Sequence, residues 1–163
     1  MRYADGPTTE ARTRVAAPPE AVWELVTDPG FLAGVSTEMQ RAEWLDGDAP
    51  GPGARLRGHH HHDARGDWTT VSTVTAWEPA RRFEWTVEAG AEGGEAAVWG
   101  FDLTPDGDGT ALRQWARMGP GPSGLTEVIA RMPDKEERIV EGRLREWRAG
   151  MERNLDAVRE RLA

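Results

Sequence analysis

The chain has 163 residues, a formal net charge of −8, eight tryptophans and no cysteine. Its length fits one domain with a sizeable core, so we predict a single domain over residues 1–163. The acidic balance argues against a nucleic-acid partner, because phosphate contacts need Lys and Arg on one face, and the absence of cysteine excludes disulfides, thiolate catalysis and cysteine metal sites.

The N-terminal part predicts a strand and two short helices. Residues 1–7 are expected to form a loose tail, and the weak alternation over Thr8–Ala16 favours an edge strand. A helix is predicted over Glu20–Thr27, and Asp28-Pro29 ends it and starts a second one. The apolar residues expected on the buried faces of these helices are Val22, Leu25, Val26, Phe31, Leu32 and Val35.

The middle of the chain consists of predicted strands and turns. The strands are expected at Met39–Trp44, Ala54–His62, Trp68–Trp77, Arg82–Glu88, around Trp99–Leu103, and at Thr110–Met118. Turn residues gather in Gly47–Gly53, Glu78–Ala80, Ala89–Gly94 and Pro105–Gly109. Six successive strands joined by short turns predict an antiparallel meander.

The C-terminal part predicts one long helix. Gly119–Pro122 cannot continue a strand, and Leu125–Met132 suits a short helix before the break at Pro133. The closing helix is expected over Asp134–Arg161, with Gly150 in its interior, and would be roughly 40 Å long. Its apolar seam, in steps of three and four residues, is Val140, Leu144, Trp147, Met151, Leu155, Val158 and Leu162. Charged residues beside the seam, interpreted as the solvated face, include Arg143, Arg145, Glu146 and Arg148.

A curved antiparallel sheet closed by one long helix tends to enclose a cavity, so this order of elements predicts a small-molecule pocket. Tryptophan suits such a pocket because it has a large apolar body, although ordinary core packing uses it equally well. The residues that we expect to line the pocket are Leu56, Trp68, Thr70, Ser72, Trp85, Trp99, Phe101, Gln114, Val140, Leu144, Trp147 and Met151. For Thr70 and Ser72 the alternative is plain cross-strand packing.

All four histidines lie in one run, His59–His62. On a strand, His60 and His62 would share the face of Leu56, roughly 6.6 Å apart, a spacing that suits neighbouring proton donors and acceptors. Glu38, at the start of the neighbouring strand, is the third candidate catalytic residue. The alternatives are a zinc site formed by these three side chains, a solvated strand end, and a cloning tag. We assign no metal and no cofactor.

With its β-αα-β6-α order, the chain resembles the START/Bet v-like helix-grip superfamily, in its bacterial polyketide cyclase/dehydratase-like branch. The stretches that carry this resemblance are Val22–Pro29, Arg41–Gly47, Gly53–Gly58, Trp68–Trp85 and Glu146–Met151. The resemblance implies an α+β helix-grip fold, in which an antiparallel curved sheet wraps a long C-terminal helix around an internal cavity. One departure is Leu56, where related sequences often have Phe; another is the His59–His62 run, where they often have Arg and Asn.

The resemblance implies binding of a small apolar molecule, aromatic or polycyclic and polyketide-like. A cyclase or dehydratase would add proton transfer by His60 or His62, assisted by Glu38, in an aldol-type cyclisation or a dehydration. One alternative is a non-catalytic carrier or sensor of lipids or other hydrophobic ligands.

A second alternative is a co-chaperone-like interaction module, which predicts a small or filled cavity and an exposed apolar patch around Trp23, Phe31 and Leu32. No apolar run is long enough to cross a bilayer and no secretion signal is recognised, so we expect a cytoplasmic protein without membrane insertion. The expected partner is therefore a small hydrophobic molecule.

Overall fold

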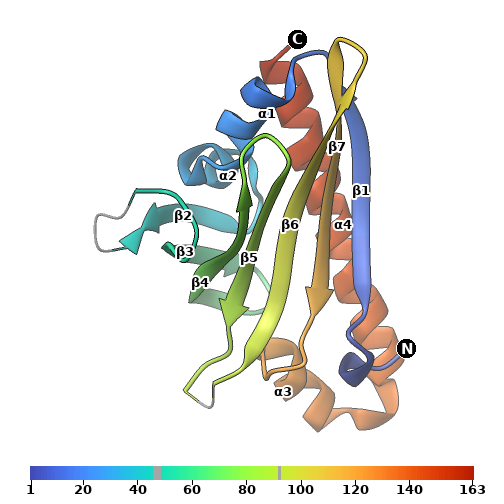
Figure 1. The fold of residues 1–163 in the computed structure, drawn as a ribbon. Helices are drawn as coiled ribbons and strands as arrows, with labels where there is room; N and C mark the ends of the chain where they lie inside the picture. Colours follow the sequence, from blue (N-terminus) through green and yellow to red (C-terminus); the bar gives the residue numbers. More distant parts are fainter. Residues whose placement is uncertain (46–48, 92) are drawn as a thin grey trace.

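The computed structural model describes residues 1–45, 49–91 and 93–163. In these residues seven strands form one antiparallel sheet in the order β1-β7-β6-β5-β4-β3-β2, and the sheet curls around the long helix α4 (Figure 1). The strands are β1 (Thr8–Val15), β2 (Met39–Trp44), β3 (Arg55–His62), β4 (Gly66–Glu78), β5 (Arg82–Glu88), β6 (Glu95–Asp106) and β7 (Gly109–Met118). The α-helices are α1 (Pro19–Val26), α2 (Pro29–Val35), α3 (Gly124–Arg131) and α4 (Glu136–Arg161).

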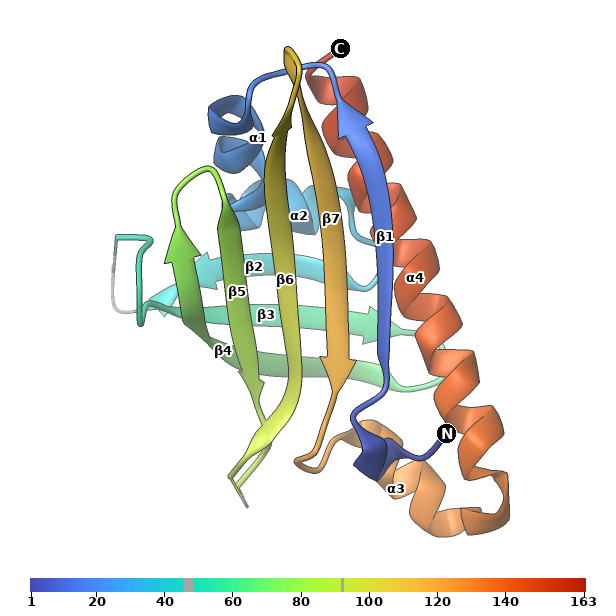
Figure 2. The same cartoon turned by 45° about the vertical axis from the view of Figure 1, so that its right-hand side comes forward.

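The sheet bends along β4, because the two parts of this strand pair with strands that run in different directions. Its first part pairs with β3 up to Thr73, and its last part pairs with β5 from Ser72 onward, with a register shift between Val74 and Ala76. Such a bulge bends a strand and increases its twist. As a result β2 and β3 run across the direction of β5, β6 and β7 (Figure 2), which leaves a concave face toward α4.

The alternation of each strand sets which side chains reach that concave face. In β7 the buried side chains are spaced two residues apart, and they are Thr110, Leu112, Gln114, Ala116 and Met118. Residues of this spacing lie on one face of a strand. The inner face of β7 is therefore mostly apolar, with Thr110 and Gln114 as its polar members.

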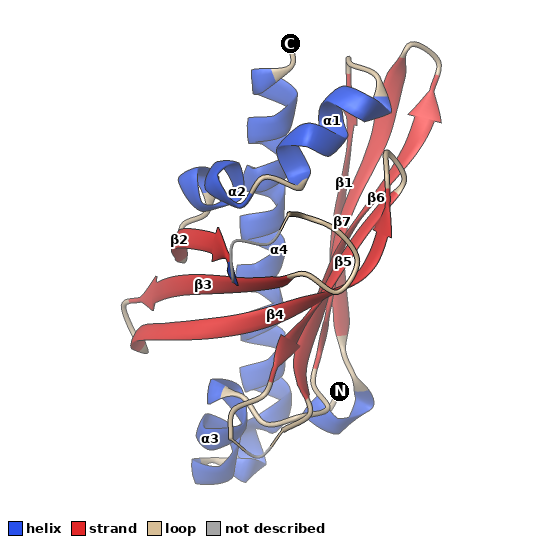
Figure 3. Cartoon of the chain, turned by 60° about the vertical axis from the view of Figure 1, so that its left-hand side comes forward, coloured by secondary structure: helices blue, strands red, loops and turns tan. Residues whose placement is uncertain are grey.

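The helices close the two ends of the curved sheet. Figure 3 shows α1 and α2 near the C-terminal end of α4, whereas α3 lies near its N-terminal end. The predicted seam of α4 is confirmed: its fully buried members are Val140, Leu144, Met151, Leu155 and Val158, and Trp147 and Leu162 are partly buried. No helix in the described ranges is long and apolar enough to span a membrane.

The predicted helix-grip fold is confirmed, including the element order and the meander. The closing helix begins at Glu136 instead of Asp134, because Pro133–Lys135 forms a 3-10 turn, here η3. Part of the predicted turn Gly47–Gly53, the end of Arg41–Gly47, and residue 92 in the predicted loop Ala89–Gly94 lie outside the described residues.

The first seven residues differ from the expected loose tail. They contain a 3-10 helix, η1 (Tyr3–Asp5), and Tyr3 is only 7% exposed. The Tyr3 hydroxyl donates a hydrogen bond to the carbonyl oxygen of Gly121 at 2.7 Å, and the Tyr3 amide donates to Glu136 Oε2 at 2.8 Å. The aromatic ring packs on Val140 and Leu144, so one large side chain fixes a segment that lacks any periodic pattern.

The exposed apolar patch that a protein-interaction module would need is absent from the predicted place. Phe31 and Leu32 are buried at 9% and 7% exposure, and Trp23 packs edge-on against Trp77 with ring centroids 5.0 Å apart. These side chains join the main core between α1, α2 and the sheet. They stabilise the fold instead of forming a docking surface.

Candidate functional site

A cavity of about 340 Å³ lies between the concave face of the sheet and α4. Nine of the residues expected to line the pocket lie on its wall, and they are Leu56, Trp68, Thr70, Ser72, Trp85, Trp99, Gln114, Trp147 and Met151. The volume falls within the range of small-molecule sites. A hollow of this kind is what the sequence prediction depends on.

Three tryptophans form the flat apolar part of the wall. Trp85 and Trp99 are paired across β5 and β6, and their rings are stacked at 10° with centroids 6.4 Å apart. Trp147, from α4, lies 4.7 Å from Trp99 between ring centroids. Rigid aromatic surfaces of this area favour a flat apolar ligand, because they bury it without losing much side-chain freedom.

His60 lies on the cavity wall and is held by its neighbours. Its ring stacks on Trp68 at 14° with centroids 5.1 Å apart, and its Nε2 is 2.9 Å from Thr70 Oγ1. Gly58 makes room for it, because a Cβ there would lie 2.7 Å from His60 Nε2. Burial lowers the pKa of His60 to about 4, against a smaller opposing effect of Glu38. At neutral pH this imidazole is therefore uncharged.

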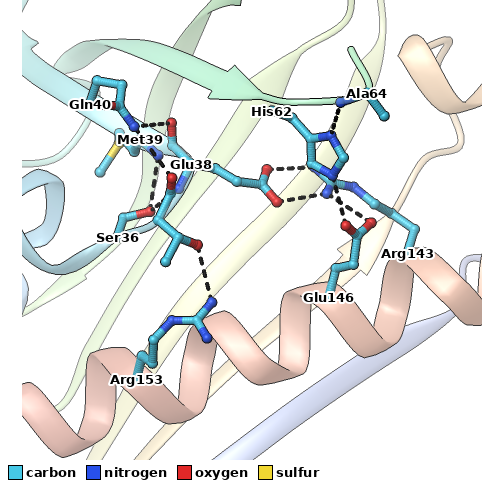
Figure 4. Close-up of polar contacts among 10 residues, drawn as sticks. Ser36, Glu38, Met39, Gln40, His62, Ala64, Arg143, Glu146 and Arg153 are labelled. Carbon is cyan, nitrogen blue, oxygen red and sulfur yellow. Dashed lines mark hydrogen bonds and ion pairs between the residues drawn. The ribbon is translucent and has the colours of Figure 1, made fainter. Parts of the chain in front are cut away.

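Glu38, Arg143, Glu146 and His62 form a polar cluster (Figure 4), in which all but His62 line the cavity. The two carboxylate oxygens of Glu38 accept hydrogen bonds from Arg143 Nη1 and Nη2, both at 2.7 Å. Arg143 Nη1 also contacts Glu146 at 3.3 Å, and His62 Nε2 lies 2.7 Å from Glu146 Oε2. The amide of Ala64 donates to His62 Nδ1, so the ring proton is on Nε2 and is donated to Glu146.

The hydrogen bonds and ion pairs of this cluster hold its arginine and carboxylates in their charged forms. Burial of Arg143 acts to lower its pKa, but the hydrogen bonds and charge of Glu38 more than reverse this and raise it. Burial likewise acts to raise the pKa of Glu146, whereas the hydrogen bond from His62 and the charge of Arg143 lower it. Both groups thus keep their charge at neutral pH.

The zinc site considered from the sequence would need His60, His62 and Glu38 together. The structure does not bring His60 to the other two, because its Nε2 is directed to Thr70. Glu38, His62 and Glu146 do place one ligand atom each within 4.8 Å of one another. The Arg143 guanidinium, however, bridges the two carboxylates, so a cationic group already occupies the position that a metal would need.

Three predicted lining residues lie elsewhere. Phe101 is completely buried against Trp85, at 6.0 Å between ring centroids, and Val140 and Leu144 pack with Tyr3 and Met118. Alternation put Phe101 on the inner face correctly, but the cavity is shorter than the strand, and the rest of that face is closed by core packing. His62 also does not line the cavity, because it turns toward Glu146.

Several wall residues were not predicted. Arg143 and Glu146 were interpreted as the solvated face of the last helix, yet both line the cavity, and the Arg143 side chain is only 10% exposed. Arg143 is three residues from Val140 and four from Trp147, so its position at the edge of the apolar seam could have indicated this. Arg65 and Asn154 are further wall residues that were not predicted, and Gly150 of α4 also lines the cavity.

Asn154 adds a polar spot to the cavity. Its Nδ2 donates to Gln114 Oε1 at 3.1 Å, whereas its Oδ1 is buried and has no hydrogen-bond partner among the described residues. Such an amide pair on α4 and β7 fixes the relative position of the two elements.

Comparison with known proteins agrees with this geometry. The model of the family described as "Polyketide cyclase / dehydrase and lipid transport" matches residues 7–163. A search of curated proteins gave no match. The solution structure of the Polyketide_cyc-like protein Cgl2372 from Corynebacterium glutamicum is 27% identical, with a TM-score of 0.66 over 93% of this chain and 88% of that one.

More distant structures share the fold. TTHA0849 from Thermus thermophilus is 19% identical, with a TM-score of 0.63 over 96% of this chain and 97% of that one. Ara h 8.0201 is 14% identical, with a TM-score of 0.58 over 96% of this chain and 97% of that one. The chain therefore belongs to the polyketide cyclase/dehydrase and lipid transport family and has its Bet v-like helix-grip fold, which supports binding of a hydrophobic ligand.

Proposed function

We propose that this protein binds a small, flat apolar molecule, aromatic or polycyclic, in the cavity between the sheet and α4, and acts as its carrier or sensor. The observation that carries the proposal is the cavity of about 340 Å³ with Trp85, Trp99 and Trp147 on its wall. The side chains around an empty apolar cavity lack packing contacts on one side. A ligand that fills the cavity supplies these contacts.

Acid–base catalysis by His60, His62 and Glu38 is the second candidate function. Three observations favour ligand binding without catalysis. Glu38 is held by two hydrogen bonds from Arg143, so its oxygens are already engaged. With a pKa of about 4, His60 is a weak proton acceptor at neutral pH. His62 donates to Glu146 and lies outside the cavity wall.

Filling the cavity from α4 tests the proposal. Gly150 lines the cavity, and a Cβ added there meets no atom within 4 Å, so the side chain of Gly150→Leu would project into the hollow. The probe is phenylnaphthylamine, an uncharged aromatic dye whose emission rises in apolar surroundings. We expect Gly150→Leu to weaken its binding at least about tenfold, since a tenfold loss corresponds to about 1.4 kcal/mol of lost contact.

Gly142→Leu is the matched control, because Gly142 lies on the same helix but not on the cavity wall. It should bind the dye as the wild type does. Energy transfer from the wall tryptophans to the dye gives a second readout of the same titration. The proposal is wrong if the wild type does not bind the dye, or if the two leucine variants bind it equally well.

A further inference from the structure

Arg65 is a charged residue on the rim of the cavity. It follows β3 in the turn to β4, it is exposed on one side, and it lines the cavity on the other. Its guanidinium lies over the Trp68 ring at 4.1 Å from the centroid. Gly124, the first residue of α3, makes room for it, because a Cβ at that position would overlap the guanidinium. The Arg65 side chain is therefore positioned by β4 on one side and by α3 on the other.

Among the residues that the structure describes, Arg65 is the charged wall residue for which no ion pair or hydrogen bond is found. Arg143 is bound to Glu38, Glu146 accepts from His62, and Glu88 is paired with Arg55 at 3.2 Å. Within the described parts of the chain, no carboxylate lies within 4.0 Å of the Arg65 guanidinium and no hydrogen bond from it is formed. Its planar set of N–H donors remains available to a ligand.

We propose that the ligand is an amphipathic aromatic molecule with an oxyanion, such as a carboxylate, that accepts hydrogen bonds from Arg65 at the rim while its apolar body lies against the tryptophans. This inference rests on the proposed function, because it assigns a polarity to the same cavity. A guanidinium stacked on an aromatic ring presents its donors in a fixed fork, which suits two oxygens of one acid group.

Arg65 is surrounded by charged groups of both signs. Burial is the main cause that lowers the pKa of Arg65, followed by the positive charge of Arg143, while Glu38, Glu127 and Glu146 act in the opposite direction. Arg143 pairs with both Glu38 and Glu146 and offsets one of their two negative charges, and the neutral His62 donates a hydrogen bond to Glu146. Glu127 is exposed on α3, so water screens its charge.

A matched pair of dyes tests the inference. Anilinonaphthalene sulfonate and phenylnaphthylamine share one aromatic skeleton and differ in the acid group. We expect the wild type to prefer the sulfonate, and Arg65→Met, which keeps a long side chain over Trp68, to lose about 3- to 10-fold in affinity for it. Affinity for the neutral dye should stay unchanged. Arg65→Lys should restore part of the preference, since it restores the charge.

Arg57→Met controls for net charge. Arg57 is exposed on the face of β3 that points away from the cavity, and it does not line the cavity. The Arg57→Met variant should therefore keep the wild-type preference for the sulfonate. If Arg65→Met binds the sulfonate as tightly as the wild type, or loses both dyes equally, the inference is wrong while the proposed function stands. If neither dye binds the wild type, the proposed function itself fails.

Discussion

His60 shows how the cavity changes the chemistry of a single residue. Burial keeps it uncharged in the folded protein, with a pKa of about 4, against an ordinary value of 6.5 in the unfolded chain. Between these two values the unfolded chain binds more protons than the folded protein does. The free energy of unfolding should therefore fall as the pH drops through this window, by at most about 3 kcal/mol from this residue. Urea denaturation of wild type and His60→Gln between about pH 7 and about pH 4.5 measures it, and the variant should show a flatter profile.

The pKa of His61 is shifted in the opposite direction, so this residue serves as a comparison for His60. It is exposed on the other face of β3, and its hydrogen bonds to Asp67 and Asp63 raise its pKa. A raised pKa stabilises the folded protein at low pH, and that contribution is lost as the pH rises through the folded value. His61→Gln should thus remove a stabilisation that is constant below about pH 6.5, and leave the slope of the profile between about pH 6.5 and about pH 4.5 unchanged. A His60→Gln profile as steep as that of the wild type would contradict the account of His60.

Wall residues can be predicted from the sequence where strand alternation determines which side chains face the cavity. They are difficult to predict where a charged side chain is buried by an ion pair. Trp85, Trp99 and Gln114 follow from strand periodicity, because every second side chain faces inward. Arg143 does not follow, since a charged helix residue is normally solvated and its burial depends on Glu38, 105 residues away. Arg65 is also missed, because its place depends on room left by Gly124 in another element.

At the scale of elements, the Glu38–Arg143 pair joins the connection between α2 and β2 to the middle of α4. The two side chains are only 26% and 10% exposed, so loss of one partner leaves a partly desolvated charge. We expect Arg143→Met to lower the free energy of unfolding by about 2 kcal/mol, measured by denaturant titration. Arg148→Met should cost less than about 0.5 kcal/mol, because Arg148 and Glu152 form an exposed pair on the same helix.

A double-mutant cycle with Glu38→Gln separates pairing from packing. If the pair acts as described, the cost of Arg143→Met should shrink by about 1 kcal/mol in the Glu38→Gln background. Equal costs in the two backgrounds would mean that Arg143 stabilises the protein through its apolar contacts with Trp147 alone. The pH profile of His60 provides an independent check, because Glu38 also influences its pKa.

The order of helices and strands can be predicted here because each element has its own local sequence pattern. The boundaries of β2 coincide with the predicted Met39–Trp44, and α4 differs by two residues at its start. The bend of β4 is different, because a bulge beside Val74 is a property of pairing with β5 and leaves no local pattern. Tyr3 likewise becomes ordered only through contacts with residues more than 90 positions away.

For the whole molecule, the cavity implies a conflict between stability and binding. The wall side chains around a hollow lack contacts on one side, which costs free energy in the unliganded protein. A ligand that binds only the folded state recovers it by mass action, about 2.7 kcal/mol at a hundred times its dissociation constant. For a chain of 163 residues this corresponds to a rise in melting temperature of about 5 to 10 °C with saturating phenylnaphthylamine.

The two glycine variants of α4 separate this effect from helix propensity. Both Gly150→Leu and Gly142→Leu remove a glycine from a helix interior, so both should gain up to about 1 kcal/mol without ligand. Only Gly150→Leu also takes up part of the hollow, so it should melt higher than Gly142→Leu when no dye is present. When dye is added it should show a smaller further rise, about half that of the wild type for a tenfold loss of affinity. Gly142→Leu should keep the full dye-dependent rise. A dye-dependent rise of equal size in both variants would mean that the dye stabilises the protein from a site other than the cavity, because the leucine at position 150 should weaken binding in the cavity.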